Sequence, residues 1–188
     1  MKLRNVLMSA AVAVGLCGTA VAAMTSNDTT MVGGAAMYPS KNIVQNAVNS
    51  KDHTTLVAAV KAAGLVHALE GKGPFTVFAP TNEAFDMLPK GTVQTLLEKK
   101  NKQELTSILL YHVVPGDFTF ATLRADIRGH GGMVKLPTLD KGHDLTFKMN
   151  GPHNIEIVDG KGGVTQIETY DVMQSNGVIQ VVDHVLMP

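Results

Sequence analysis

The segment 75–85 constrains the fold of this chain more than any other, because it changes from an apolar strand to a helix within a few residues. All but one of the side chains of residues 75–79 are apolar, which predicts a strand buried on both faces. Pro80 ends this strand, since its ring fixes φ and its nitrogen carries no hydrogen. Thr81 and Asn82 are favoured helix N-caps, and we expect both to satisfy backbone groups at this turn.

A second apolar strand is predicted at the C-terminal end, from Val178 to Leu186. Its first residues are apolar on both faces, which predicts a central place in a sheet. Asp183 follows them among apolar neighbours. Because a buried charge needs a partner, we expect Asp183 to make a structural hydrogen bond rather than to act in catalysis.

The order of the remaining elements predicts an α+β domain, with helices first and strands later. Apolar positions at helical spacing occur throughout the first half of the chain, and alternating patterns begin at Met133. Gly64 is placed to cap the second helix. The predicted helices are Lys41–Val48 with Ser40 as its cap, Thr54–Ala63, a turn at Leu65–Leu69, Val93–Glu98, a helix opened by Asn101 and carrying Leu105, Ile108 and Leu109, and Thr119–Ile127.

The N-terminus predicts export from the cytoplasm. Lys2 and Arg4 precede an uncharged apolar run that ends in the cleavage pattern Ala-x-Ala, so residues 1–22 are predicted to be a signal peptide. A membrane anchor is the alternative, although the run of about 17 residues is at the short limit for a spanning helix. Residues 23–38 are polar and without periodicity, which predicts a flexible lead-in, and the folded domain is expected over residues 39–188.

Composition excludes several classes of protein. The single cysteine, Cys17, lies in the predicted signal peptide, so the mature chain has no disulfide and no thiolate nucleophile. Without Lys2 and Arg4 the 16 basic residues become 14, against 16 acidic residues, and the charges are interspersed, which argues against a nucleic-acid binder. No later segment is apolar enough to cross a membrane. The mature length suits one domain, and we expect a monomer.

Three segments in the same order resemble the fasciclin (FAS1) domain, and the resemblance covers roughly Pro39 to Pro188, nearly the whole mature chain. They are residues 76–85, residues 109–116 and residues 176–188. The resemblance implies a β-wedge sandwich with helices packed along one side. It also implies a bacterial secreted or periplasmic single-domain protein that works in adhesion or interaction, with a cell-surface or matrix protein or glycan as its partner.

The resemblance also suggests a partner-binding site. The segment of Tyr111 and His112 is linked to receptor binding in animal relatives, together with a pair that corresponds to Asp171 and Val172 here. These four residues are the candidate contact site, expected at exposed edges, and a structural role for Tyr111 and His112 is the alternative. The chain departs from the family at Gln180, where histidine is frequent, so a polar network around that position is expected to differ.

The alternative function is a periplasmic small-ligand or metal-binding protein that uses the loop histidines His130, His143 and His153. These histidines have no recognised ligand spacing, so no metal and no cofactor is predicted. The chain has no Gly-x-Ser-x-Gly motif and its carboxylates are scattered singly, which argues against an enzyme. A weak hydrolase remains a third possibility.

Overall fold

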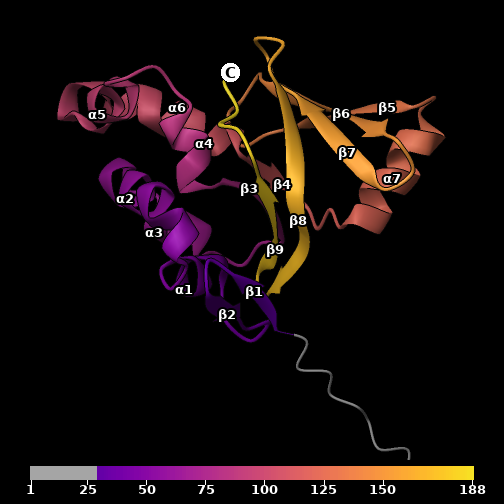
Figure 1. Ribbon diagram of the computed structural model, residues 1–188, viewed down its shortest axis with the longest axis horizontal. Helices are drawn as coiled ribbons and strands as arrows, with labels where there is room; N and C mark the ends of the chain where they lie inside the picture. The colour runs from indigo at the N-terminus through magenta and orange to yellow at the C-terminus, as the bar shows by residue number, and fades with distance from the viewer. Residues whose placement is uncertain (1–28) are drawn as a thin grey trace, which may run out of the picture.

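The computed structural model describes residues 29–188, which form a seven-stranded sheet, a small hairpin and a set of short helices (Figure 1). The strand order in the large sheet is β4-β3-β9-β8-β7-β6-β5. The strands are β3 Phe75–Pro80, β4 Val113–Pro115, β5 Met133–Pro137, β6 Asp144–Asn150, β7 Asn154–Val158, β8 Val164–Gln174 and β9 Gly177–Val182. The predicted α+β class is confirmed.

The first and third of the fasciclin-like segments supply β3 and β9, which form the one parallel pair of this sheet. β3 pairs with β9 from Phe75 opposite Gly177 to Pro80 opposite Val182, whereas the other neighbouring strands are antiparallel. Every residue of β9 is buried, and in β3 only Phe75 is partly exposed. The prediction that both strands are buried on two faces and that the C-terminal strand is central is therefore confirmed.

β8 bends the sheet into a wedge. Its first residues pair with β7, its later residues pair with β9, and the register shifts between Ile167, Thr169 and Val172. Such bulges bend a strand and increase its twist. β5, β6 and β7 therefore turn away from the plane of β3 and β9, as the right half of Figure 1 shows.

The helices lie mainly on one side of the central strands (Figure 1). On this side an apolar cluster fills the space between the sheet and six helices, which are α1 Ile43–Ala47, α2 Thr54–Ala63, α3 Val66–Leu69, α4 Asn82–Asp86, α5 Thr92–Leu97 and α6 Lys102–Tyr111. Short 3-10 helices at Lys51–His53 and Lys99–Asn101 join them. A second cluster fills the wedge on the other side, where α7, Phe120–Gly129, packs on β5 and β6.

Local sequence accounts for most helix ends. α2 has the predicted bounds, and Gly64 caps it with φ of 75° in the left-handed region. The first helix begins later than predicted, because Asn42 rather than Ser40 forms the N-cap. The Asn42 side chain accepts from the nitrogen of Gln45, whose own side chain accepts from the nitrogen of Asn42, so a complete capping box fixes this start.

The described part of the predicted flexible lead-in is ordered, which corrects that prediction. β1, Thr30–Val32, and β2, Ala35–Met37, form an antiparallel hairpin around Gly33 and Gly34. Both glycines have positive φ, as a type I′ hairpin turn requires. Met37 is 3% exposed and belongs to the core. The predicted signal peptide lies outside the described residues.

We predict that Gly177→Ala destabilises the domain by several kcal/mol, because a methyl group there would overlap the backbone of Phe75 in the adjacent strand. Gly177 also has φ of 150°, which L side chains rarely adopt. Urea unfolding measures the change. Gly129→Ala is the control, since its methyl would meet no atom within 4 Å, and it should be as stable as the parent or up to about 1 kcal/mol more stable. Equal stabilities for the two variants would contradict this account.

Candidate functional site

Tyr111 and His112 lie in the core, at the end of α6, rather than at an exposed edge. Tyr111 is 0% exposed and His112 is 2% exposed. Neither side chain is available to a partner in this structure. The expectation that this pair lies on the surface is therefore corrected, and the structural alternative describes its contacts.

His112 joins α6 to the C-terminal segment. Its Nδ1 is 2.7 Å from the carbonyl of Ile108, and its Nε2 accepts a hydrogen bond from the nitrogen of Leu186 at 3.0 Å. This arrangement requires the neutral ring with its proton on Nδ1. Burial lowers the pKa of His112 from its ordinary value of 6.5 to about 4, although the Ile108 carbonyl and Asp159 favour the charged form.

Tyr111 fixes the opposite side of the same helix end. Its hydroxyl donates to the carbonyl of Asp144 at 3.1 Å and accepts from the nitrogen of Gly160 at 2.8 Å. Burial raises the pKa of this phenol above its ordinary value of 10.0, so the hydroxyl keeps its proton. Tyr111 thus connects the start of β6 with the turn between β7 and β8.

Asp171 and Val172 lie in the bulged part of β8, and their side chains face the interior. Val172 is 1% exposed. Asp171 is half-buried and has φ of 56°, the one non-glycine residue with positive φ in the described chain. Its carboxylate accepts from the nitrogen of Phe120 at 2.7 Å and from the amide of Gln180 at 2.9 Å. It therefore holds the first turn of α7.

Gln180 completes this polar cluster from the neighbouring strand β9. It is 0% exposed, accepts from the nitrogen of Asp171 at 3.0 Å, and donates to the carbonyl of Phe118 at 3.0 Å. One amide side chain thus fixes the β8 bulge and the segment before α7. At Gln180 the chain departs from the family pattern. The side-chain oxygen and the amide nitrogen of this buried residue both have hydrogen-bond partners.

Thr81, Asn82 and Asp183 make hydrogen bonds to backbone groups at the ends of β3 and β9. Thr81 caps α4 by accepting from Ala84. The Asn82 side chain accepts from the nitrogen of Thr55 at 3.0 Å and donates to the carbonyl of Lys51 at 2.8 Å, so it ties α4 to the start of α2. Asp183 accepts from the nitrogen of Gln166 at 2.8 Å and pairs with His184.

Asn176 is a structural residue whose role sequence reasoning missed. Its side chain accepts from the nitrogen of Ile43 at 3.0 Å and donates to the carbonyls of Leu69 and Gly71 at 2.8 and 3.0 Å. These contacts attach α1 and α3 to the turn before β9. Asn-Gly at positions 176–177 signals a turn, but no local pattern shows that the asparagine bonds to residues more than 100 positions away.

The loop histidines do not come together. His130 contacts the carbonyl of Asp126, His143 contacts the carboxylate of Asp140, and His153 lies in the turn between β6 and β7. Over residues 29–188 no group of three or more histidine, cysteine, aspartate or glutamate side chains is arranged to hold a metal ion. The same residues include no helix long and apolar enough to cross a membrane.

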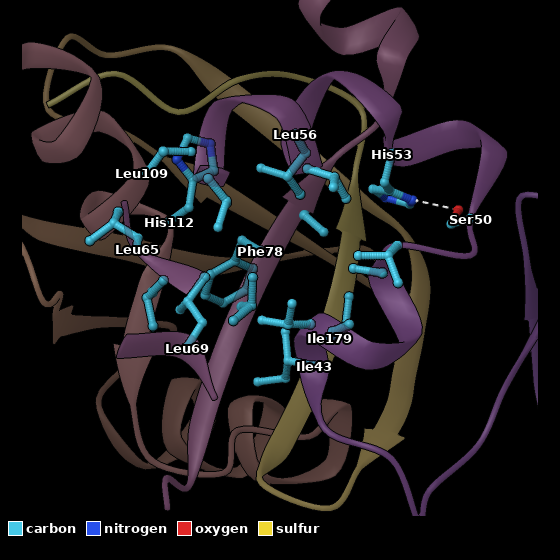
Figure 2. Close-up of a pocket in the computed structure, with 18 of the residues that line it drawn as sticks. Ile43, Ser50, His53, Leu56, Leu65, Leu69, Phe78, Leu109, His112 and Ile179 are labelled. Carbon is cyan, nitrogen blue, oxygen red and sulfur yellow. Dashed lines mark hydrogen bonds between the residues drawn. The ribbon is translucent and has the colours of Figure 1, made fainter. Parts of the chain in front are cut away.

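An apolar cavity of about 90 Å³ lies between the helices and the sheet (Figure 2). Its walls come from α1, α2 and α3 on one side and from β3, β9 and the end of α6 on the other. Nearly all its lining side chains are aliphatic or aromatic, including Ile43, Leu56, Leu69, Phe78 and Ile179. It lies within the first core cluster and is walled almost entirely by apolar side chains.

Comparison with known proteins agrees with this architecture. Residues 51–188 match the fasciclin domain, so the chain belongs to the fasciclin domain family. The chain is 44% identical over 179 residues to Protein sll1483 of a Synechocystis strain, which covers 94% of this chain and 90% of that protein. It is 39% identical over 133 residues to transforming growth factor-beta-induced protein ig-h3 of Sus scrofa, which covers 71% of this chain but 17% of that protein.

A solved structure confirms the predicted fold. A FAS1 domain pair from the insect cell adhesion molecule fasciclin I superimposes with a TM-score of 0.70, over 80% of this chain and 52% of that chain, at 18% sequence identity. The β-wedge with helices along one side is therefore the fold of this domain.

His112 should make stability depend on pH. As the pH falls from 6.5 to about 4, the unfolded chain binds a proton at this residue while the native ring stays neutral, so about 3 kcal/mol of stability is lost. His112→Gln should lower the free energy of unfolding at pH 7 but remove this part of the pH dependence. Urea unfolding of both chains across this range gives the difference, and parallel curves would contradict the assignment.

The Tyr111 hydroxyl should contribute about 1–2 kcal/mol, because Tyr111→Phe removes two partly buried hydrogen bonds, to the nitrogen of Gly160 and to the carbonyl of Asp144. The matched control is Tyr38→Phe, since Tyr38 is 44% exposed. Its unfolding free energy should lie within about 0.5 kcal/mol of the parent. The assignment fails if the two variants are equally stable in thermal and urea unfolding.

Proposed function

We propose that this protein is an exported recognition domain, secreted or periplasmic, that binds a cell-surface or matrix protein or glycan as a monomer. No cofactor takes part and no bond is made or broken. The observation that supports it most is membership of the fasciclin family, together with a fold shared with a domain pair from an insect cell adhesion molecule. Among the described residues, the hydrogen-bonded polar clusters above connect backbone segments, which suits a rigid scaffold.

The recognition surface follows from which side chains are exposed. Since Tyr111, His112 and Val172 are buried, we place the surface at the hairpin end of the domain, where β2 contacts β8. Three of the exposed large apolar side chains lie on these segments: Met31 of β1 is 61% exposed, Tyr38, which directly follows β2, is 44% exposed, and Met173 of β8 is 40% exposed.

A cation lies beside this surface. The Lys41 ammonium is 4.8 Å from the centre of the Tyr38 ring. Tyrosine and methionine are enriched in the centres of protein interfaces, and a cation over an aromatic ring is attracted by the ring's negative face. Both protein and glycan partners can be bound by such a set, because an aromatic face packs on either.

The test is partner capture by the full chain from native cell envelope and extracellular matrix. Tyr38→Asp combined with Met31→Asp should reduce capture at least tenfold and leave the melting temperature within about 2 °C, since both side chains are exposed. Met87→Asp combined with Met133→Asp is the control, because these methionines are 56% and 51% exposed and lie on other elements.

Two results would contradict the proposed surface. If the variant with Tyr38→Asp and Met31→Asp captures the partner as well as the parent does, the recognition surface lies elsewhere on the domain. An equal loss in the control variant would show that capture depends on general surface polarity. Tyr111→Ala and His112→Ala serve as folding controls. If capture is lost only in these variants, and they no longer unfold cooperatively, then capture requires the folded domain.

A further inference from the structure

The lining of the apolar cavity includes solvent-exposed side chains at the end of α1 and on α2, which form its mouth. Val44 of α1 and its C-cap Val48 are four residues apart, one helical turn, as are Val57 and Lys61 of α2. Val48 is 47% exposed, whereas the cavity floor at Ile179 is 5% exposed. The lining therefore runs from a closed apolar floor to an apolar mouth.

Lys61 is the one permanently charged side chain in the lining. Lysine covers apolar surface with its carbon stem and keeps its ammonium group in water. Among residues 29–188 the ion pairs do not involve Lys61, so no protein carboxylate neutralises it. The mouth of an apolar cavity thus carries an unneutralised cation.

The other polar groups of the lining do not face the cavity. Ser50 bonds to Nδ1 of His53 at 2.9 Å, and both ring nitrogens of His112 are occupied. Nε2 of His53 has no hydrogen-bond partner but is also closed to water, so it does not open into this space. The Ala79 carbonyl lies near that ring without forming a hydrogen bond, and burial lowers the pKa of His53.

We propose that this cavity binds the hydrocarbon end of a free medium-chain carboxylic acid, whose carboxylate stays at the mouth beside Lys61. A carboxylate placed inside would lose its hydration without a partner, so the head group remains outside. A cavity of 150 Å³ holds the six carbons of benzene, and in proportion 90 Å³ holds roughly four. The rest of an eight-carbon chain would lie along Val44, Val48 and Val57.

Calorimetry and amide chemical shifts of the full chain with octanoate test this proposal. We expect one site per chain, with shifts centred on α1, α2 and β9. Affinity should rise up to about fourfold for each methylene between butanoate and octanoate, because each added group leaves water. No saturable binding at millimolar octanoate, or no dependence on chain length, would overturn the proposal.

Two pairs of variants separate the cavity from its mouth. Val57→Trp should fill the cavity and block binding. Val93→Trp is the control and should not block binding. Val93, like Val57, is a half-buried helical valine, and it packs against the first core cluster, but it does not line the cavity. Lys61→Met should weaken octanoate binding about two- to fivefold and leave octanol binding unchanged, whereas the exposed Lys90→Met should alter neither. Equal effects within either pair would refute the site.

A membrane lipid is the other source of such a chain. Flotation of the protein with phosphatidylglycerol vesicles distinguishes the two. We expect no flotation. Flotation that Val57→Trp abolishes would assign the cavity to a membrane lipid and contradict binding of the free acid. The proposed recognition surface at the hairpin is unaffected by either result, because Met31 and Tyr38 are not part of the lining.

Discussion

The parallel pairing of β3 with β9 is the constraint on which the rest of this domain depends. Parallel strands cannot be joined by a hairpin, so the chain between Pro80 and Gly177 must return to the end of the sheet at which β3 begins before β9 can start, and β4 to β8 form along this path. The two strands are also buried on both sides, with the helices over one face and the wedge over the other. Both apolar clusters therefore share these strands, and neither can form without them.

Side chains at the ends of this pair hold the surrounding elements in place. Asn176 attaches the first helices at one end, and Asn82 and Asp183 bind backbone groups at the other. His112 brings the C-terminal segment against α6. The motifs that identify the family thus contain residues that hold the scaffold together. The exposed residues are not needed for this, so they can vary according to the partner that is bound.

Patterns within short segments predicted much of the fold. The double-sided apolar character of residues 75–79 and 178–182 indicated the central strands, and helical spacing with Gly64 gave the bounds of α2. The burial of His112 was not predictable in this way, because a histidine at a helix end is favourable as a surface cation. Its partner Leu186 is 74 residues away in the sequence. The hairpin at residues 30–37 did carry a local signal, the pair Gly33-Gly34, but its strands are too short to show alternation.

Native-state hydrogen exchange measures most directly whether the β3–β9 pair is the last part of the domain to open. The account predicts that the amides of β3 and β9, and the amide of Leu186 that bonds to His112, exchange only through global unfolding, with a free energy equal to that from urea. Amides of the hairpin β1–β2 should exchange through smaller openings. If β3 and β9 exchange at a free energy well below the global value, the central claim is contradicted.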